Sequence, residues 1–139
     1  MLSDQIKKYY DKKYDLNCAE AIMYAANEEY DLNLNKQTFK TMSAFGGGMG
    51  IESVCGAITG ALAVLGIMFT KERAHESDRI KRLDVEFFNA FVEELGTMDC
   101  KVLKQKYRND DMRCSLMVDK AAMILDKMVQ RERVLDKDH

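Results

Sequence analysis

The chain has 139 residues, which is the size of one domain, and we expect a single domain over residues 1–139. Hydrophobic residues make up 47% and charged residues 32%, so the chain can bury a core and is not a disordered protein. Lys and Arg number 21 against 23 Asp and Glu, which gives a formal net charge of -2. This balance lacks the basic excess of nucleic-acid-binding and polybasic membrane-surface proteins, so we expect no nucleic-acid partner.

The chain contains no proline and no tryptophan. Because proline interrupts helices, its absence from a chain rich in Ala, Leu, Met, Lys and Glu predicts long helices. The longest apolar run, residues 54–69, is shorter than the roughly 20 residues that cross a bilayer. The first 14 residues are mostly polar and do not resemble a secretory signal. We therefore expect a soluble, cytoplasmic protein without a membrane span.

Polar caps and apolar spacing predict the helices in chain order. The expected helices cover residues 3–14, from 17 onward, 36–45, from 52 or 53 to 69, 73–95, a short segment after 97 or 99, and 110 to the 130s. Ser3 or Asp4 is the expected cap of the first helix, and Asn17 with Glu20 predicts a capping box for the second. The glycines at 46, 47, 48 and 50 predict a flexible turn before the fourth helix.

The fourth helix is apolar nearly all round, which places it at the centre of a bundle. Gly56 and Gly60 lie four residues apart on its small face, where another backbone could approach closely. Gly96 is the expected stop of the fifth helix. No segment has the period of a strand, so we predict an all-α, compact single-domain bundle of about six or seven helices.

The four cysteines share two expected features. Cys18, Cys55, Cys100 and Cys114 each fall near the start of a predicted helix and on its apolar stripe. The unpaired N–H groups at a helix start lower the pKa of a thiol, and inward-facing stripes could bring the sulfurs together. Taken one at a time, each cysteine is better explained by inert core packing, because free cysteine behaves as a small buried hydrophobe.

Several familiar motifs are missing. There is no C-x-x-C pair, no haem-attachment sequence and no phosphate loop or dinucleotide fingerprint around Gly46–Gly50. His75 and His139 are the only histidines, and both are expected in solvated positions. A zinc hydrolase with several histidine ligands is therefore excluded.

The order of the cysteines resembles that of a known family. Cys18, then Cys55-Gly56-Ala57-Ile58-Thr59-Gly60, then Cys100 and Cys114 is similar to the C_GCAxxG_C_C family of redox-active proteins. Its members have a similar length and four cysteines, with the second in a C-G-A-x-x-G motif after a glycine-rich stretch. The resemblance covers nearly the whole chain and implies functional roles for the four cysteines, Gly56 and Gly60. Members are often encoded near transporter genes. A similar domain occurs in a multihaem cytochrome, whose haem-attachment sequences are absent here.

Three hypotheses follow. The first is thiol–disulfide exchange with a redox partner that the sequence does not identify, as in a thiol–disulfide oxidoreductase, with Cys55 as the most activated thiol. Four cysteines allow three pairings. The second is binding of zinc or an iron–sulfur cluster by Cys18, Cys55, Cys100 and Cys114. The third is a helical interaction module that assists a transporter or forms a homodimer through a small-residue or Met-rich face.

Overall fold

The computed structural model describes residues 1–137, so the predicted position of His139 lies outside the described residues. Its α-helices are α1 (Leu2–Tyr9), α2 (Cys18–Glu29), α3 (Lys36–Lys40), α4 (Gly56–Phe69), α5 (Arg79–Leu95), α6 (Cys100–Tyr107) and α7 (Ser115–Lys137). Short helical turns, η1 (Lys12–Tyr14), η2 (Gly48–Glu52) and η3 (Ala74–Glu76), lie between them. Over residues 1–137 no strand forms, and the all-α prediction is confirmed. In this part of the chain no helix is both long and apolar enough to cross a membrane.

Local capping chemistry fixes several helix ends where the sequence predicts them. Asn17 accepts a hydrogen bond from the backbone of Glu20 at 2.7 Å, and Glu20 accepts one from the backbone of Asn17 at 2.9 Å. Asp99 caps α6 by accepting from the backbone of Val102. Gly96 ends α5 with a left-handed φ of 85°, a conformation that glycine adopts without a steric penalty. These caps set the positions of α2, α5 and α6.

The first and third helices are shorter than predicted. The first begins at Leu2, not at a Ser3 or Asp4 cap, because Leu2 is fully buried in the core. It ends at Tyr9, and Asp11 caps a separate turn by accepting from the backbone of Lys13. The third helix ends at Lys40, where the Ser43 hydroxyl donates to the carbonyl of Lys40 and stabilises a turn.

Three other helices begin later than predicted. The turn η2 holds left-handed backbone conformations, so α4 begins at Gly56. The carboxylate of Glu76 accepts from the backbone N–H groups of residues 71–73 and forms a turn of its own before α5. An isolated antiparallel bridge between Asn109 and Arg113 delays the start of α7 to Ser115.

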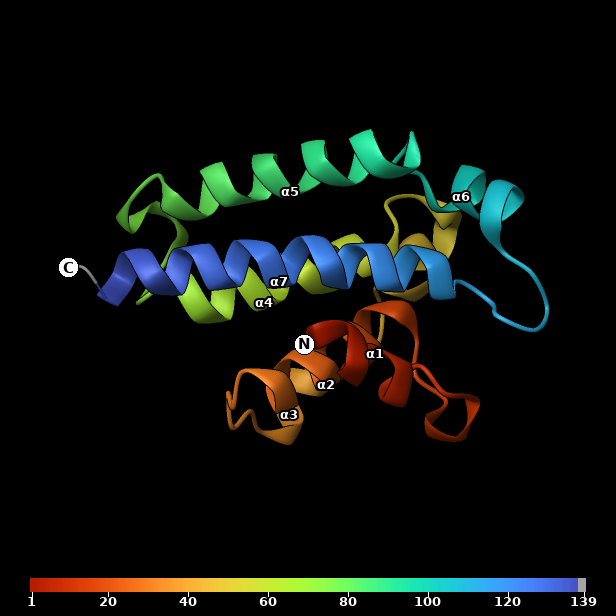
Figure 1. Ribbon diagram of the computed structural model, residues 1–139, viewed down its shortest axis with the longest axis horizontal. Helices are drawn as coiled ribbons and strands as arrows, with labels where there is room; N and C mark the ends of the chain where they lie inside the picture. The colour runs from red at the N-terminus through yellow and green to blue at the C-terminus, as the bar shows by residue number, and fades with distance from the viewer. Residues whose placement is uncertain (138–139) are drawn as a thin grey trace.

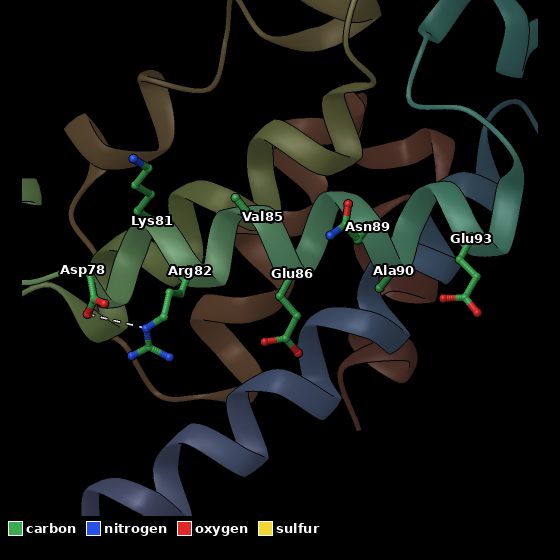
Figure 2. Close-up of a pocket in the computed structure, with 8 residues that line it drawn as sticks. All are labelled: Asp78, Lys81, Arg82, Val85, Glu86, Asn89, Ala90 and Glu93. Carbon is green, nitrogen blue, oxygen red and sulfur yellow. Dashed lines mark ion pairs between the residues drawn. The ribbon is translucent and has the colours of Figure 1, made fainter.

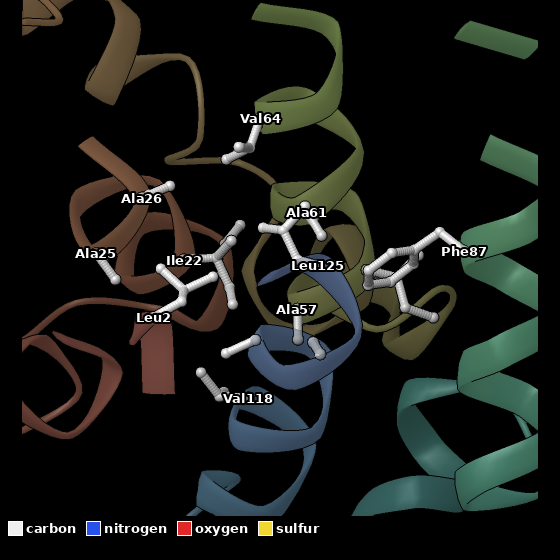
Figure 3. Packing of buried hydrophobic residues seen from close by; sticks show 14 of the residues in the cluster. Leu2, Ile22, Ala25, Ala26, Ala57, Ala61, Val64, Phe87, Val118 and Leu125 are labelled. Atoms are coloured by element: carbon white, nitrogen blue, oxygen red, sulfur yellow. The ribbon is translucent and has the colours of Figure 1, made fainter. Parts of the chain in front are cut away.

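The apolar α4 lies at the centre, packed against α2, α5 and α7, as its composition predicts. Figure 1 shows α5 and α7 running side by side on one side of the molecule, with α1, α2 and α3 on the other. Between them, Ile22, Ala61, Phe87 and Leu125 belong to one buried cluster (Figure 3). Burial of this apolar surface is the main force that holds the bundle together.

Close approach of α2 to α4 depends on the two glycines of the C-G-A-x-x-G motif. A Cβ on Gly60 would lie 2.8 Å from the carbonyl oxygen of Ala19, and one on Gly56 would lie 3.4 Å from the Cβ of Cys18. The small face of α4 is therefore covered within the same chain by α2, and the contact brings Cys18 toward the start of α4.

The buried carboxylates of the core are partnered. Asp126 accepts a hydrogen bond from the Tyr30 hydroxyl at 2.6 Å. Glu132 forms an ion pair with Arg79 at 3.0 Å. Because both groups are satisfied within the bundle, they serve packing, and the reactive groups lie elsewhere.

Candidate functional site

All four cysteines line one small cavity of about 40 Å³. Its remaining lining residues are Gly47, Gly56, Leu103, Lys104 and Met117. The cavity lies where α6, the glycine-rich turn and the first turn of α7 meet at one end of the molecule (Figure 1). Segments that are far apart in the sequence thus place their thiols around a common space.

Each cysteine lies at the amino-terminal end of a helix, as predicted. Cys18 and Cys100 are the first residues of α2 and α6, Cys55 is the cap of α4, and Cys114 directly precedes α7. Cys55, Cys100 and Cys114 are buried, with exposed fractions of 4%, 6% and 8%, and Cys18 is half-buried. The four cysteines are free thiols.

A short antiparallel pairing sets Cys55 beside Cys100. Val54 and Asp99 form an isolated bridge. The backbone N–H of Cys55 donates to Met98 at 2.9 Å, and that of Cys100 donates to Ser53 at 2.6 Å. These bonds hold the start of α4 against the start of α6.

The glycine-rich turn passes directly over this pairing. Gly48 has a φ of 63°, and a Cβ there would lie 2.8 Å from the Cβ of Cys100. Gly46 packs against Asn17, where a Cβ would meet the Asn17 side chain at 2.5 Å. Gly47 and Gly50 also have left-handed backbones but open space around them. Of the predicted motif glycines, Gly47 and Gly56 line the cysteine cavity.

Cys18 and Cys114 form the second close pair, and each thiol is the largest influence on the pKa of the other. Tyr10 joins them: its hydroxyl lies 3.5 Å from the Cys18 sulfur and accepts a hydrogen bond from the Cys114 backbone at 3.3 Å. The sequence analysis missed Tyr10. The signal that could have found it is the spacing Leu2, Ile6, Tyr10, which continues the buried face of α1.

The two thiols of this pair have opposite pKa shifts. The neighbouring Cys18 thiol, together with the positive charges of Arg108 and Lys104, lowers the pKa of Cys114 to about 6. The proximity of Cys114, together with burial, raises the pKa of Cys18 well above its ordinary value. Since both cations act on Cys114, a negative charge is more stable on Cys114 than on Cys18.

The sequence predicts Cys55 as the most activated thiol, but the pKa of Cys55 is raised, not lowered. Burial raises the pKa of Cys55 to about 11, although hydrogen bonds from the backbone N–H groups of Ala57 and Ile58 act in the opposite direction. Burial also raises the pKa of Cys100. Cys55 does lie at a helix start, whose N–H groups stabilise a thiolate. This stabilisation is smaller than the cost of placing a charge in the core. The structure favours Cys114 as the thiolate.

The metal hypothesis requires several ligands at one point. Within residues 1–137, no group of three or more His, Cys, Asp or Glu side chains is arranged to hold a metal ion. The cysteines share a cavity as two adjoining pairs, Cys18 with Cys114 and Cys55 with Cys100.

A larger surface depression lies away from the cysteines, on the exposed face of α5 (Figure 2). Its lining includes Lys81, Val85 and Glu93, and Asp78 pairs with Arg82 at 3.5 Å. No cysteine, histidine or buried polar group is among its lining residues. None of the residues that line this depression is buried.

The fold and the site define an all-α protein with four clustered thiols. Residues 16–128 match the family described as "Putative redox-active protein (C_GCAxxG_C_C)", and the chain belongs to this family. The match includes all four cysteines and both motif glycines, and Tyr10 lies before it. No curated protein and no solved structure gives a significant match to the chain.

Proposed function

We propose that the protein is a thiol–disulfide oxidoreductase whose working dithiol is Cys18 and Cys114. The observation that carries this proposal is that both thiols line one cavity and that Tyr10 contacts both residues. Arg108 and Lys104 act on only one of the two sulfurs, that of Cys114. A thiolate next to a thiol is the arrangement that disulfide exchange requires, because one sulfur attacks and the other resolves the product.

The reaction proceeds in two exchanges with a substrate disulfide, R–S–S–R′. The Cys114 thiolate attacks one sulfur, forms a mixed disulfide with R–S, and releases R′–S⁻. Cys18 then loses its proton, which the released thiolate takes up to become R′–SH. The Cys18 thiolate attacks the Cys114 sulfur and releases R–S⁻, which takes a proton from solvent. The protein ends with a Cys18–Cys114 disulfide, and the substrate has gained two electrons and two protons.

Of the three pairings that four cysteines allow, this geometry favours Cys18 with Cys114 and Cys55 with Cys100. The antiparallel bridge supports the second pair, whose raised pKa values suit it less for the attacking role. We infer a cytoplasmic location, since free thiols persist in a reducing compartment, and a redox partner that presents a disulfide or a dithiol. The family resemblance also suggests association with a transporter. The exposed methionines suggest a homodimer, and we keep both as proposals.

Peptide mapping tests the pairing. The reduced full chain is treated with oxidised glutathione without oxygen, alkylated, digested and analysed by mass spectrometry. We expect a peptide pair joined by Cys18 and Cys114, with the loss of about two hydrogens from the protein mass. The Cys114→Ser variant should lose this link, and the Cys55→Ser variant should keep it.

Two results would contradict the proposal. A first disulfide between Cys55 and Cys100 would move the working dithiol to the other pair. Untreated protein that carries the added mass of zinc or of an iron–sulfur cluster would favour the second candidate, in which the four thiols around the cavity rearrange to bind it.

A further inference from the structure

Tyr10 is the polar side chain at the site that the exchange reaction does not yet use. We propose that Tyr10 is a positioning residue of the dithiol, whose hydroxyl holds the Cys18 sulfur against Cys114 and donates a hydrogen bond to Cys18 in the second exchange. This inference rests on the proposed function and adds a residue that lies outside the family match.

The hydrogen bonds around Tyr10 have a consistent direction. The backbone N–H of Cys114 donates to the Tyr10 oxygen at 3.3 Å, so that oxygen acts as an acceptor there. Its own proton is then free to point at the Cys18 sulfur, 3.5 Å away. Tyr10 therefore contacts both members of the pair, Cys114 through its backbone N–H and Cys18 through its sulfur.

The tyrosine ring is held in place from outside the cavity. The guanidinium of Arg113 lies 4.2 Å from the centre of the Tyr10 ring and also donates to the Tyr10 carbonyl oxygen. Burial raises the pKa of Tyr10, so its hydroxyl keeps its proton over the range in which thiols exchange. Tyr10 is therefore a fixed hydrogen-bond donor and does not compete as an acid or a nucleophile.

The hydroxyl matters most after the first exchange. Cys114 is then a neutral mixed disulfide, and Cys18 must carry the negative charge. Tyr10 donates a hydrogen bond to that charge and keeps its own proton, while the Cys18 proton leaves with the released thiolate. A hydrogen bond to a charged sulfur stabilises it more than one to a neutral thiol, so Tyr10 favours the resolving step over the first step.

The test separates the two exchanges in time. The background is the Cys55→Ser Cys100→Ser double variant of the full chain, in which only Cys18 and Cys114 react. Stopped-flow mixing with 5,5′-dithiobis(2-nitrobenzoate) releases one coloured thiol in each exchange. In the Tyr10→Phe variant we expect a first release within about 2-fold of the background and a second release slowed about 10-fold or more. Mass spectrometry should then detect the mixed disulfide on Cys114.

Tyr107→Phe is the matched control. The Tyr107 hydroxyl donates to the carbonyl of Leu95 at 3.3 Å, and no cysteine is its hydrogen-bond partner. Its removal should leave both releases unchanged. Arg113→Lys keeps the Tyr10 hydroxyl but removes the planar group that fixes the ring, and should slow the second release by a smaller factor. This variant also carries the test should Tyr10→Phe fail to fold, as judged by helical circular dichroism.

The outcomes distinguish the inference from the proposed function. Equal second-release rates in Tyr10→Phe and the background, or equal slowing of both releases, would overturn the role of Tyr10 and leave the dithiol intact. No second release in the background itself would overturn the dithiol. If Tyr10→Phe slows only the second release and Tyr107→Phe slows neither, the positioning role of Tyr10 is established.

Discussion

Cys114 combines burial with a charge, which is costly unless specific partners stabilise the anion. Its exposed fraction is 8%, and burial alone would raise its pKa. The neighbouring thiol and the cations on α6 outweigh that cost. Cys100 and Lys104 lie four residues apart in α6, and Arg108 is the cap residue that follows its last turn. This segment therefore supplies both a thiol and the charges that activate another one.

The lowered pKa of Cys114 predicts an unusual pH profile for its alkylation. Only the thiolate reacts, and the thiolate fraction rises as the pH rises through the pKa. The rate at Cys114 should therefore be half-maximal near pH 6, whereas an ordinary cysteine has a pKa of 9.0. Peptide-resolved mass spectrometry after iodoacetamide pulses at several pH values measures this profile.

The Arg108→Gln variant tests whether the charge of Arg108 sets the pH profile of Cys114 alkylation. Removal of one positive charge should move the midpoint at Cys114 to higher pH, because the anion loses part of its stabilisation. Cys55 in the same samples should react only at much higher pH, since its pKa is about 11. A midpoint near pH 9 at Cys114 would show that its neighbours do not stabilise the thiolate.

At the scale of the elements, caps were the predictable part of the fold. Asn17, Asp99 and Gly96 act through residues at most four positions away, so the sequence alone indicates their helix ends. The later start of α4 follows from the left-handed turn η2 and from the bridge between Val54 and Asp99, which joins distant segments. A sequence pattern does not contain such a contact.

The contact between α2 and α4 predicts opposite effects for two glycines of the same helix. In Gly60→Ala the new methyl group would meet the Ala19 carbonyl oxygen at 2.8 Å, so we expect destabilisation by about 1–3 kcal/mol. At Gly66 a Cβ meets nothing within 4 Å, and Gly66→Ala should stabilise the helix by up to about 1 kcal/mol. Urea unfolding followed by circular dichroism measures both variants.

The contact between α2 and α4 also affects the position of Cys18 in the cysteine cavity. Because Gly56 and Gly60 set the distance between α2 and α4, a shift of α2 would move Cys18 relative to Cys114. Gly60→Ala should therefore slow formation of the Cys18–Cys114 disulfide, and Gly66→Ala should not. Equal stability of the two variants would mean that the helices are not held together at Gly60.

At the scale of the whole molecule, the site is built from segments spread over most of the chain. The cysteine pattern predicted that the thiols matter, and the apolar stripes predicted that they face inward. Neither could select the pairs, since Cys18 meets Cys114 only after α1, α2 and α7 have packed together. Tyr10, Arg108 and Arg113 were missed for the same reason, because each acts on residues that become neighbours only in the folded chain.

A Cys18–Cys114 disulfide would tie the start of α2 to the start of α7 and close a loop that contains most of the protein. Such a link restricts the unfolded chain, and a disulfide that closes a loop of about 100 residues stabilises the folded protein by up to about 5 kcal/mol. We expect the oxidised protein to unfold at a higher urea concentration than the reduced protein, measured by circular dichroism with and without reductant. Cys55→Ser should keep this difference and Cys18→Ser should lose it. If the oxidised form unfolded at the same or a lower urea concentration, the disulfide would have to strain the native packing between α2 and α7, and the two thiols would not be positioned for reversible exchange.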